Sequence, residues 1–257
     1  MFESQWHPLF IVGDQGHLQL FKCIFEKIDD KNPKSYDGCM VLHLSTQEGH
    51  LEICKFILEN VQDQTYQDDN GITPLHTAAY NGHLEVYKVI MDLVVDKNPR
   101  SMCHSGYTPL HSAAHEGHLD ICVLIVKYAI DKNPTRNDRM TPLHIASYKG
   151  HLEICKLLIH DAADKSPQDN QGMTPLHFAA ENGHLEVCKF LMENISEKNP
   201  RDNFGDTPLG LAKKNRHFKT ACFITKYLAN QKFQANQNLT TWLHVKLLST
   251  CLYLLGY

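Results

Sequence analysis

The sequence has no apolar segment as long as the roughly 18 to 20 residues that a membrane-spanning helix requires. It also lacks a basic and apolar leader, because residues 1–5 read MFESQ, so we expect a protein that is not secreted and cysteines that are reduced thiols. Its 42% hydrophobic and 21% charged residues are typical of a folded chain and not of a disordered one. These features predict a soluble, cytoplasmic protein, with a nuclear or membrane-peripheral location as alternatives.

Motifs of common enzymes are missing as well. The sequence contains no G-x-S-x-G, no G-x-x-x-x-G-K-[ST], and no G-x-G-x-x-G after a predicted strand. Ser, His and Asp are numerous but recur at equivalent places, whereas an active site needs one asymmetric group of residues. We therefore expect a protein that is not an enzyme, with no catalytic residues and no cofactor.

A repeated pattern fills the chain. The segment TPLH recurs at 73–76, 108–111, 141–144 and 174–177, with TPLG at 207–210. Degraded copies stand at 7–10 (HPLF) and 40–43 (MVLH). The starts lie 33 residues apart, except for one step of 35 residues, and a GHL segment follows at the same spacing. The two additional residues fall within 100–107, where we predict a longer loop.

Each repeat predicts two short helices and a turn. Thr141 is a typical N-cap, Pro142 suits the first helical position, and His144 can reach back to the cap as in a capping box. Gly150 supplies the left-handed residue that ends this helix, and a second amphipathic helix follows from His151. Turn-forming Asp, Asn, Pro and Gly residues then predict a hairpin-like finger.

A period of 33 residues with T-P-L-H-x-A is the pattern of ankyrin repeats, and residues 174–193 (TPLHFAAENGHLEVCKFLME) resemble that family. The resemblance covers about residues 2–230. It implies an all-α repeat solenoid: an ankyrin-type, L-shaped stack of helix-turn-helix units with β-hairpin-like fingers and a concave face. The predicted organisation is an array at 1–231 followed by a tail at 232–257, with units at about 2–34, 35–67, 68–102, 103–135, 136–168, 169–201 and 202–231.

The many His and Cys residues follow the repeat, so we interpret them as structural. Twelve of the seventeen His residues fall at two template positions, in the first helix and at the start of the second, and Cys54, Cys122, Cys155 and Cys188 recur where unit 3 has Tyr87. One cluster departs from the template: unit 4 holds Cys103, His104, His111, His115 and His118, which leaves zinc binding as an alternative. Because His111 and His118 are template residues and no C-x-x-C or H-E-x-x-H is present, we predict no metal site.

The C-terminal part is basic. No acidic residue follows Asp206, so residues 207–257 carry a net charge of +7 and the preceding part −11. The basic residues are too sparse to favour nucleic acid. In the tail, the apolar run 247–257 follows Trp242, His244 and Lys246. The tail either caps the stack and keeps it soluble, or makes a weak contact with an anionic membrane.

The resemblance implies a non-enzymatic scaffold that presents a rigid concave face to an intracellular protein. The alternative is a membrane-associated adaptor, or a fragment of an ankyrin-bearing membrane protein, attached through the tail.

In such repeats, the residue before T-P-L-H and the residues just before the helix-ending Gly face the groove, and here they vary while the template does not. Aromatic and Met residues at these places are typical of adaptable interfaces. For the aliphatic and Met residues, packing against neighbouring fingers is the alternative. The predicted partner-binding residues are Ile72, Tyr107, Met140 and Met173, which we name the cap-preceding residues, and Tyr80, His115 and Tyr148, which we name the helix-end residues.

Overall fold

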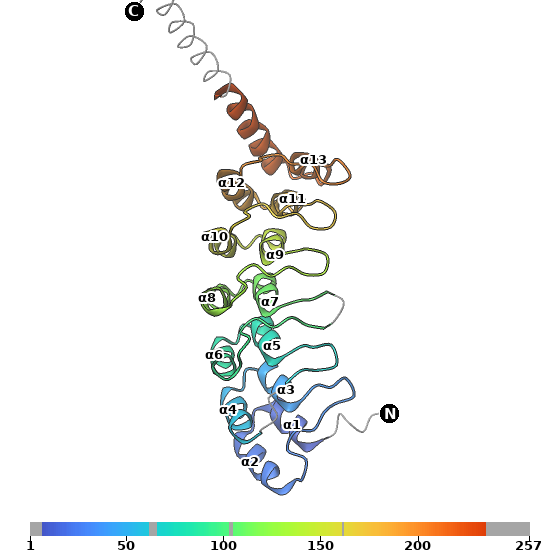
Figure 1. Ribbon diagram of the computed structural model, residues 1–257, viewed down its shortest axis with the longest axis vertical. Helices are drawn as coiled ribbons and strands as arrows, with labels where there is room; N and C mark the ends of the chain where they lie inside the picture. Colours follow the sequence, from blue (N-terminus) through green and yellow to red (C-terminus); the bar gives the residue numbers. More distant parts are fainter. Residues whose placement is uncertain (1–6, 62–65, 103–104, 161, 235–257) are drawn as a thin grey trace, which may run out of the picture.

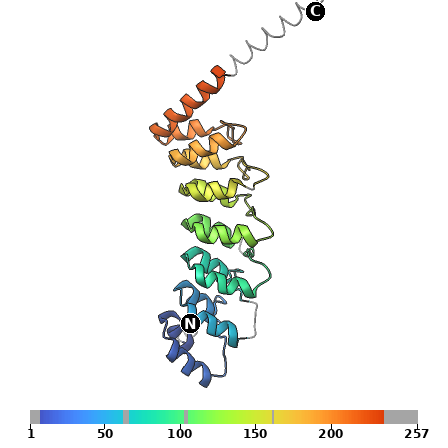
Figure 2. The same ribbon diagram turned by 90° about the vertical axis from the view of Figure 1, so that its left-hand side faces the viewer.

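The computed structural model describes residues 7–61, 66–102, 105–160 and 162–234. Within these ranges the chain forms helix pairs that stack in chain order (Figures 1 and 2). The first helix of each pair, the inner helix, lies beside the fingers, and the second, the outer helix, lies on the far side (Figure 1). The inner helices are α1 (Pro8–Gln15), α3 (Val41–Gln47), α5 (Pro74–Asn81), α7 (Pro109–Glu116), α9 (Pro142–Lys149), α11 (Pro175–Glu181) and α13 (Pro208–Lys214). The outer helices are α2 (Leu18–Lys27), α4 (Leu51–Asn60), α6 (Leu84–Leu93), α8 (Leu119–Tyr128), α10 (Leu152–His160), α12 (Leu185–Asn194) and a last helix at 218–234.

The helix ends form where the template predicts them. In α9, the Thr141 N–H donates to Nδ1 of His144 at 3.0 Å, and Pro142 occupies the first helical position. Gly150 ends the helix at φ 83°, and its N–H donates to the carbonyl of Ala146. The predicted solenoid and its repeated helix pairs are confirmed.

The core lies between successive units. The template Leu residues are buried, and Leu143 is only 2% exposed. The template cysteines fill small spaces on the outer helices; they are free thiols, and burial raises the pKa of Cys155 to about 12. A single unit has no closed core of its own, so neighbouring units stabilise one another.

The fingers are narrow turns whose backbones pair across the turn. In unit 5, the Arg136 N–H donates to the carbonyl of Met140, four residues on, at 2.8 Å. In the finger at the boundary of units 3 and 4, the Ser101 N–H donates to the carbonyl of Tyr107, six residues on, also at 2.8 Å. The two inserted residues therefore lie in this finger, as the spacing predicts. Neighbouring fingers are also linked, because the Asn137 N–H donates to the Ser105 carbonyl at 3.0 Å.

The last helix begins at residue 218 and runs through residue 234, so the predicted boundary at 231 falls inside a helix. Its inner side packs on unit 6, where Ile224 is fully buried. The predicted membrane contact of the tail depends on Trp242, His244, Lys246 and the run 247–257, which lie outside the described residues. No helix in the described part of the chain is long and apolar enough to cross a membrane.

Candidate protein-interaction surface

The cap-preceding residues are held through their backbone carbonyls. In each case the template His of the previous inner helix donates its Nε2–H to the carbonyl, at distances of 3.1 to 3.3 Å. The tautomer follows from the other ring nitrogen, which accepts the N–H of the residue that caps the same helix. The pairs are His43 with Ile72, His76 with Tyr107, His111 with Met140, and His144 with Met173.

Burial keeps these His residues neutral. It lowers the pKa of His76 and His144 to about 4 and that of His111 to about 3. A neutral ring with one donor and one acceptor nitrogen matches its two backbone partners. The predicted structural role of this template position therefore has a direct geometric basis.

The helix-end residues are held in the same manner by the second template His. The ring Nε2–H of His118 donates to the Tyr80 carbonyl at 3.1 Å, and that of His184 donates to the Tyr148 carbonyl at 2.8 Å. The ring passes over the Gly that ends the preceding inner helix. A Cβ on Gly150 would lie 2.5 Å from Nδ1 of His184, so only Gly leaves room for the ring.

Four predicted residues line one pocket of about 470 Å³ between units 3 and 4: Ile72, Tyr80, Tyr107 and His115. Tyr80 is 53% exposed, while Ile72, Tyr107 and His115 are half-buried. The remaining lining residues are polar: Gln47, His76, Thr77, Asn81, Ser105 and Ser112. Ser105 belongs to the lengthened finger, which therefore forms one wall of the pocket. A pocket that combines aromatic and aliphatic side chains with several polar groups has the composition of a docking site for a side chain.

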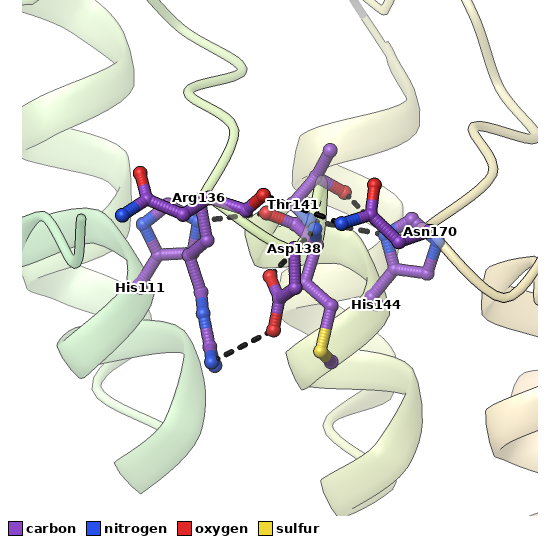
Figure 3. A network of polar contacts seen from close by, with 8 residues as sticks. His111, Arg136, Asp138, Thr141, His144 and Asn170 are labelled. Carbon is purple, nitrogen blue, oxygen red and sulfur yellow. Dashed lines mark hydrogen bonds and ion pairs between the residues drawn. The ribbon is translucent and has the colours of Figure 1, made fainter. Parts of the chain in front are cut away.

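Tyr107 is fixed from the next unit by a contact that sequence reasoning missed. The Arg136 guanidinium lies 4.5 Å from the centre of the Tyr107 ring, and it is held by an ion pair with Asp138 at 2.9 Å (Figure 3). Burial raises the pKa of the Tyr107 hydroxyl. A signal was present, because Arg136 stands where units 6 and 7 have Asp169 and Asp202.

Tyr148 lies apart from this pocket and has its own aromatic neighbour. Its ring meets Phe178 edge-on at 6.4 Å, and the Lys149 ammonium lies 5.7 Å from the Tyr148 ring centre. Tyr148 is 44% exposed. Phe178 was also missed; it stands where unit 3 has the smaller Thr77.

The two Met residues do not line this pocket. Met140 is half-buried, as Ile72 and Tyr107 are, and Met173 is only 9% exposed. Met173 therefore offers little side-chain surface to a partner, and packing against its neighbours explains it. We give the name inner groove to a set of residues on the inner helices and the fingers, which consists of Tyr148 and of five residues that line the pocket: Gln47, Ile72, Tyr80, Tyr107 and His115.

Of the His-rich cluster of unit 4, the structure describes His111, His115 and His118. His111 uses both ring nitrogens for backbone partners, and His115 contacts Glu116. Cys103 and His104 lie outside the described residues. Among the residues that the structure places, no group of three or more His, Cys, Asp or Glu is arranged to hold a metal ion.

Comparison with known families gives one match. A model described as "Ankyrin repeats (3 copies)" matches residues 9–101, 42–136, 91–169 and 125–202, overlapping along most of the chain. No curated protein matches the sequence.

Proposed function

The chain belongs to the ankyrin-repeat family, and we propose that it is a non-enzymatic scaffold that binds a protein in the inner groove, with the pocket between units 3 and 4 as its centre. Ankyrin repeats are in general protein-interaction modules. The observation that carries the proposal is the convergence of Ile72, Tyr80, Tyr107 and His115 on one open pocket. We further propose an intracellular location for this partner.

Rigidity is the proposed mechanism. His118 and His76 of adjacent units donate hydrogen bonds to the backbone carbonyls of Tyr80 and Tyr107. The Arg136 guanidinium packs on the Tyr107 ring. Such a surface is ordered before the partner arrives, so it loses little conformational entropy on binding. Aromatic anchors in well-packed pockets are where binding energy concentrates.

The test compares partner capture by three forms of the full chain: the natural sequence, Tyr80→Ala with Tyr148→Ala, and Tyr128→Ala. Tyr128 is a matched control, because it is 50% exposed but lies on the outer helix α8. Proteins retained from native cells are identified by mass spectrometry, and the affinity of a purified candidate is then measured by calorimetry.

We expect the double variant to lose at least about 2 kcal/mol of binding free energy, which is the hot-spot scale, with little change in melting temperature. Tyr128→Ala is expected to bind normally. Normal binding by the double variant, or equal loss with Tyr128→Ala, would refute the assignment to the inner groove and favour the finger tips or the outer helices.

A second candidate function is a membrane-associated adaptor. What favours it is the charge distribution, since residues 207–257 contain seven Lys or Arg and no acidic residue. This candidate attaches the chain through residues 232–257, and the test is sedimentation of the full chain with anionic vesicles, compared with a chain that ends at Gln231.

A further inference from the structure

The last helix has an exposed apolar stripe along its outer side. Residues 218, 222, 229 and 233 are spaced so that their side chains share one helix face, together with the exposed and polar Thr225. All four are exposed; Phe218 is 73% and Phe233 is 64% exposed. Phe218 and Phe233 stand at the two ends of this face, and the smaller Cys222 and Ala229 lie between them. We name the set Phe218, Cys222, Ala229 and Phe233 the apolar stripe.

Lysines border this stripe on both sides. Lys219 and Lys226 lie along one edge and Lys232 along the other, by the same helical spacing, and all three are exposed. The helix contains no acidic residue. Phe218, Lys219, Cys222 and Lys226 also line an open hollow of about 490 Å³ together with Leu185 and Phe223.

The opposite face of the helix is the one that holds it on the stack. Ile224 is fully buried, the Thr220 hydroxyl donates to the Gly183 carbonyl at 3.1 Å, and the Tyr227 hydroxyl donates to the Met192 carbonyl at 3.0 Å. Residues 229–234 are exposed, and in Figures 1 and 2 the helix leaves the end of the stack. The apolar stripe is therefore not needed to attach the helix to unit 6, although Phe218 and Cys222 border the hollow that Leu185 of that unit also lines.

We infer that helix 218–234 is a binding site for the surface of an anionic membrane, in which the apolar stripe enters the headgroup region and Lys219, Lys226 and Lys232 contact the acidic lipids. Helices that lie in a membrane interface combine an apolar face with Lys or Arg at its borders. The charge favours an anionic membrane as the partner of this face. An acidic lipid surface attracts the three lysines, and no carboxylate on the same helix offsets their charge. The site is distinct from the inner groove, and it lies within the described residues, where it overlaps the tail only at residues 232–234.

The test uses the full chain, sedimented with vesicles of phosphatidylcholine alone or of phosphatidylcholine mixed with phosphatidylserine. We expect binding to the mixed vesicles that weakens as salt is added, because exposed charges are screened. Phe218→Ser with Phe233→Ser is expected to weaken binding at least about tenfold through lost apolar burial. Phe204→Ser is the matched control, because Phe204 is 77% exposed but lies on the last finger.

The charge is tested separately. Lys219→Glu with Lys226→Glu is expected to weaken binding at least about tenfold, since each lysine near an anionic surface contributes a severalfold factor. Lys213→Glu with Lys214→Glu makes the same change in net charge on α13, away from the stripe, and is expected to have a clearly smaller effect. Melting temperatures verify that the variants are folded.

Two outcomes overturn the inference. If both helix variants bind vesicles as the natural sequence does, or if the natural sequence does not bind, the stripe is not a membrane site. If instead the chain self-associates in sedimentation velocity and Phe218→Ser with Phe233→Ser abolishes this, the stripe binds a second copy. Partner capture through the inner groove is expected to be unchanged in all of these variants, so the two proposals fail independently.

Discussion

Gly150 and Gly205 allow the role of the second template His to be measured. Both are left-handed, with φ of 83° and 84°, so replacement by Ala imposes nearly the same backbone strain at each. They differ in their surroundings: a Cβ on Gly150 would lie 2.5 Å from the His184 ring, whereas a Cβ on Gly205 would have nothing within 4 Å. Gly205→Ala therefore measures strain alone, and Gly150→Ala measures strain and the displaced ring.

The expected costs follow from these contacts. A left-handed Ala costs roughly 1 to 2 kcal/mol, which is the whole expected effect of Gly205→Ala. Gly150→Ala must also move His184, which breaks the 2.8 Å hydrogen bond to the Tyr148 carbonyl and loosens the contact between units 5 and 6. The lost bond adds about 1 kcal/mol, and lost packing adds a similar amount, so we expect a total of about 3 to 4 kcal/mol.

The assay is urea unfolding followed by far-ultraviolet circular dichroism, with free energies taken from the midpoints and slopes. His184→Ala is combined with each Gly substitution in a double-mutant cycle. Without the ring, Gly150→Ala is expected to cost only as much as Gly205→Ala. Equal costs at the two glycines in the natural background, or an undiminished cost at Gly150 in the His184→Ala background, would refute the claim that Gly is present to admit the His ring.

Two further predictions concern the core and the buried imidazoles. Leu143→Ala is expected to cost roughly 2 to 5 kcal/mol in the same urea assay, and neither chelator nor reductant is expected to lower the melting temperature; a large fall with chelator alone would restore the zinc alternative. Burial lowers the pKa of His76 and His144 to about 4 and that of His111 to about 3 in the folded chain. As the pH falls, these imidazoles are therefore protonated in the unfolded chain before they are protonated in the folded one. The stability that the three neutral imidazoles contribute is present above about pH 6.5, and about 5 kcal/mol of it is lost between about pH 7 and 5. His144→Gln keeps the capping box without a titrating group and is expected to remove about a third of that loss when unfolding is measured at both pH values; an unchanged pH dependence would contradict the assignment.

The architecture was predictable because it is encoded several times over. Thr141, Pro142 and Gly150 each signal a helix end on their own, and the same signals recur at a fixed period. The 35-residue step placed the inserted residues in the correct finger without any structural information. Because His144 recurs with the repeat, the sequence predicts a structural role for it. Its hydrogen bonds to the Thr141 N–H and the Met173 carbonyl explain that role.

The arrangement of the inner groove was less predictable, because it depends on contacts between side chains of neighbouring units. The sequence predicts that Tyr107 and Tyr148 both face the concave side, from two different template positions, but it does not indicate that Arg136 covers one ring and that Phe178 meets the other. Both missed residues replace a smaller or oppositely charged residue of the template. Substitutions of this kind reveal where a unit differs, whereas the partner of each new side chain depends on rotamers that a repeat pattern does not determine.

The hydrogen bonds of the template His residues also explain why the inner groove can vary at all. The stack needs the carbonyl groups of Tyr80 and Tyr107, because His118 and His76 bind them, and it needs nothing from their side chains at those bonds. Any residue supplies a backbone carbonyl, so the side chains at these positions are free to differ from unit to unit while the backbone stays fixed. Positions that carry a backbone contact between units therefore also carry the variable surface, which places adaptable aromatic residues on the most firmly held part of the scaffold. A partner that recognises Tyr80 and Tyr107 would gain from this coupling, because the groove does not have to be ordered when the partner binds.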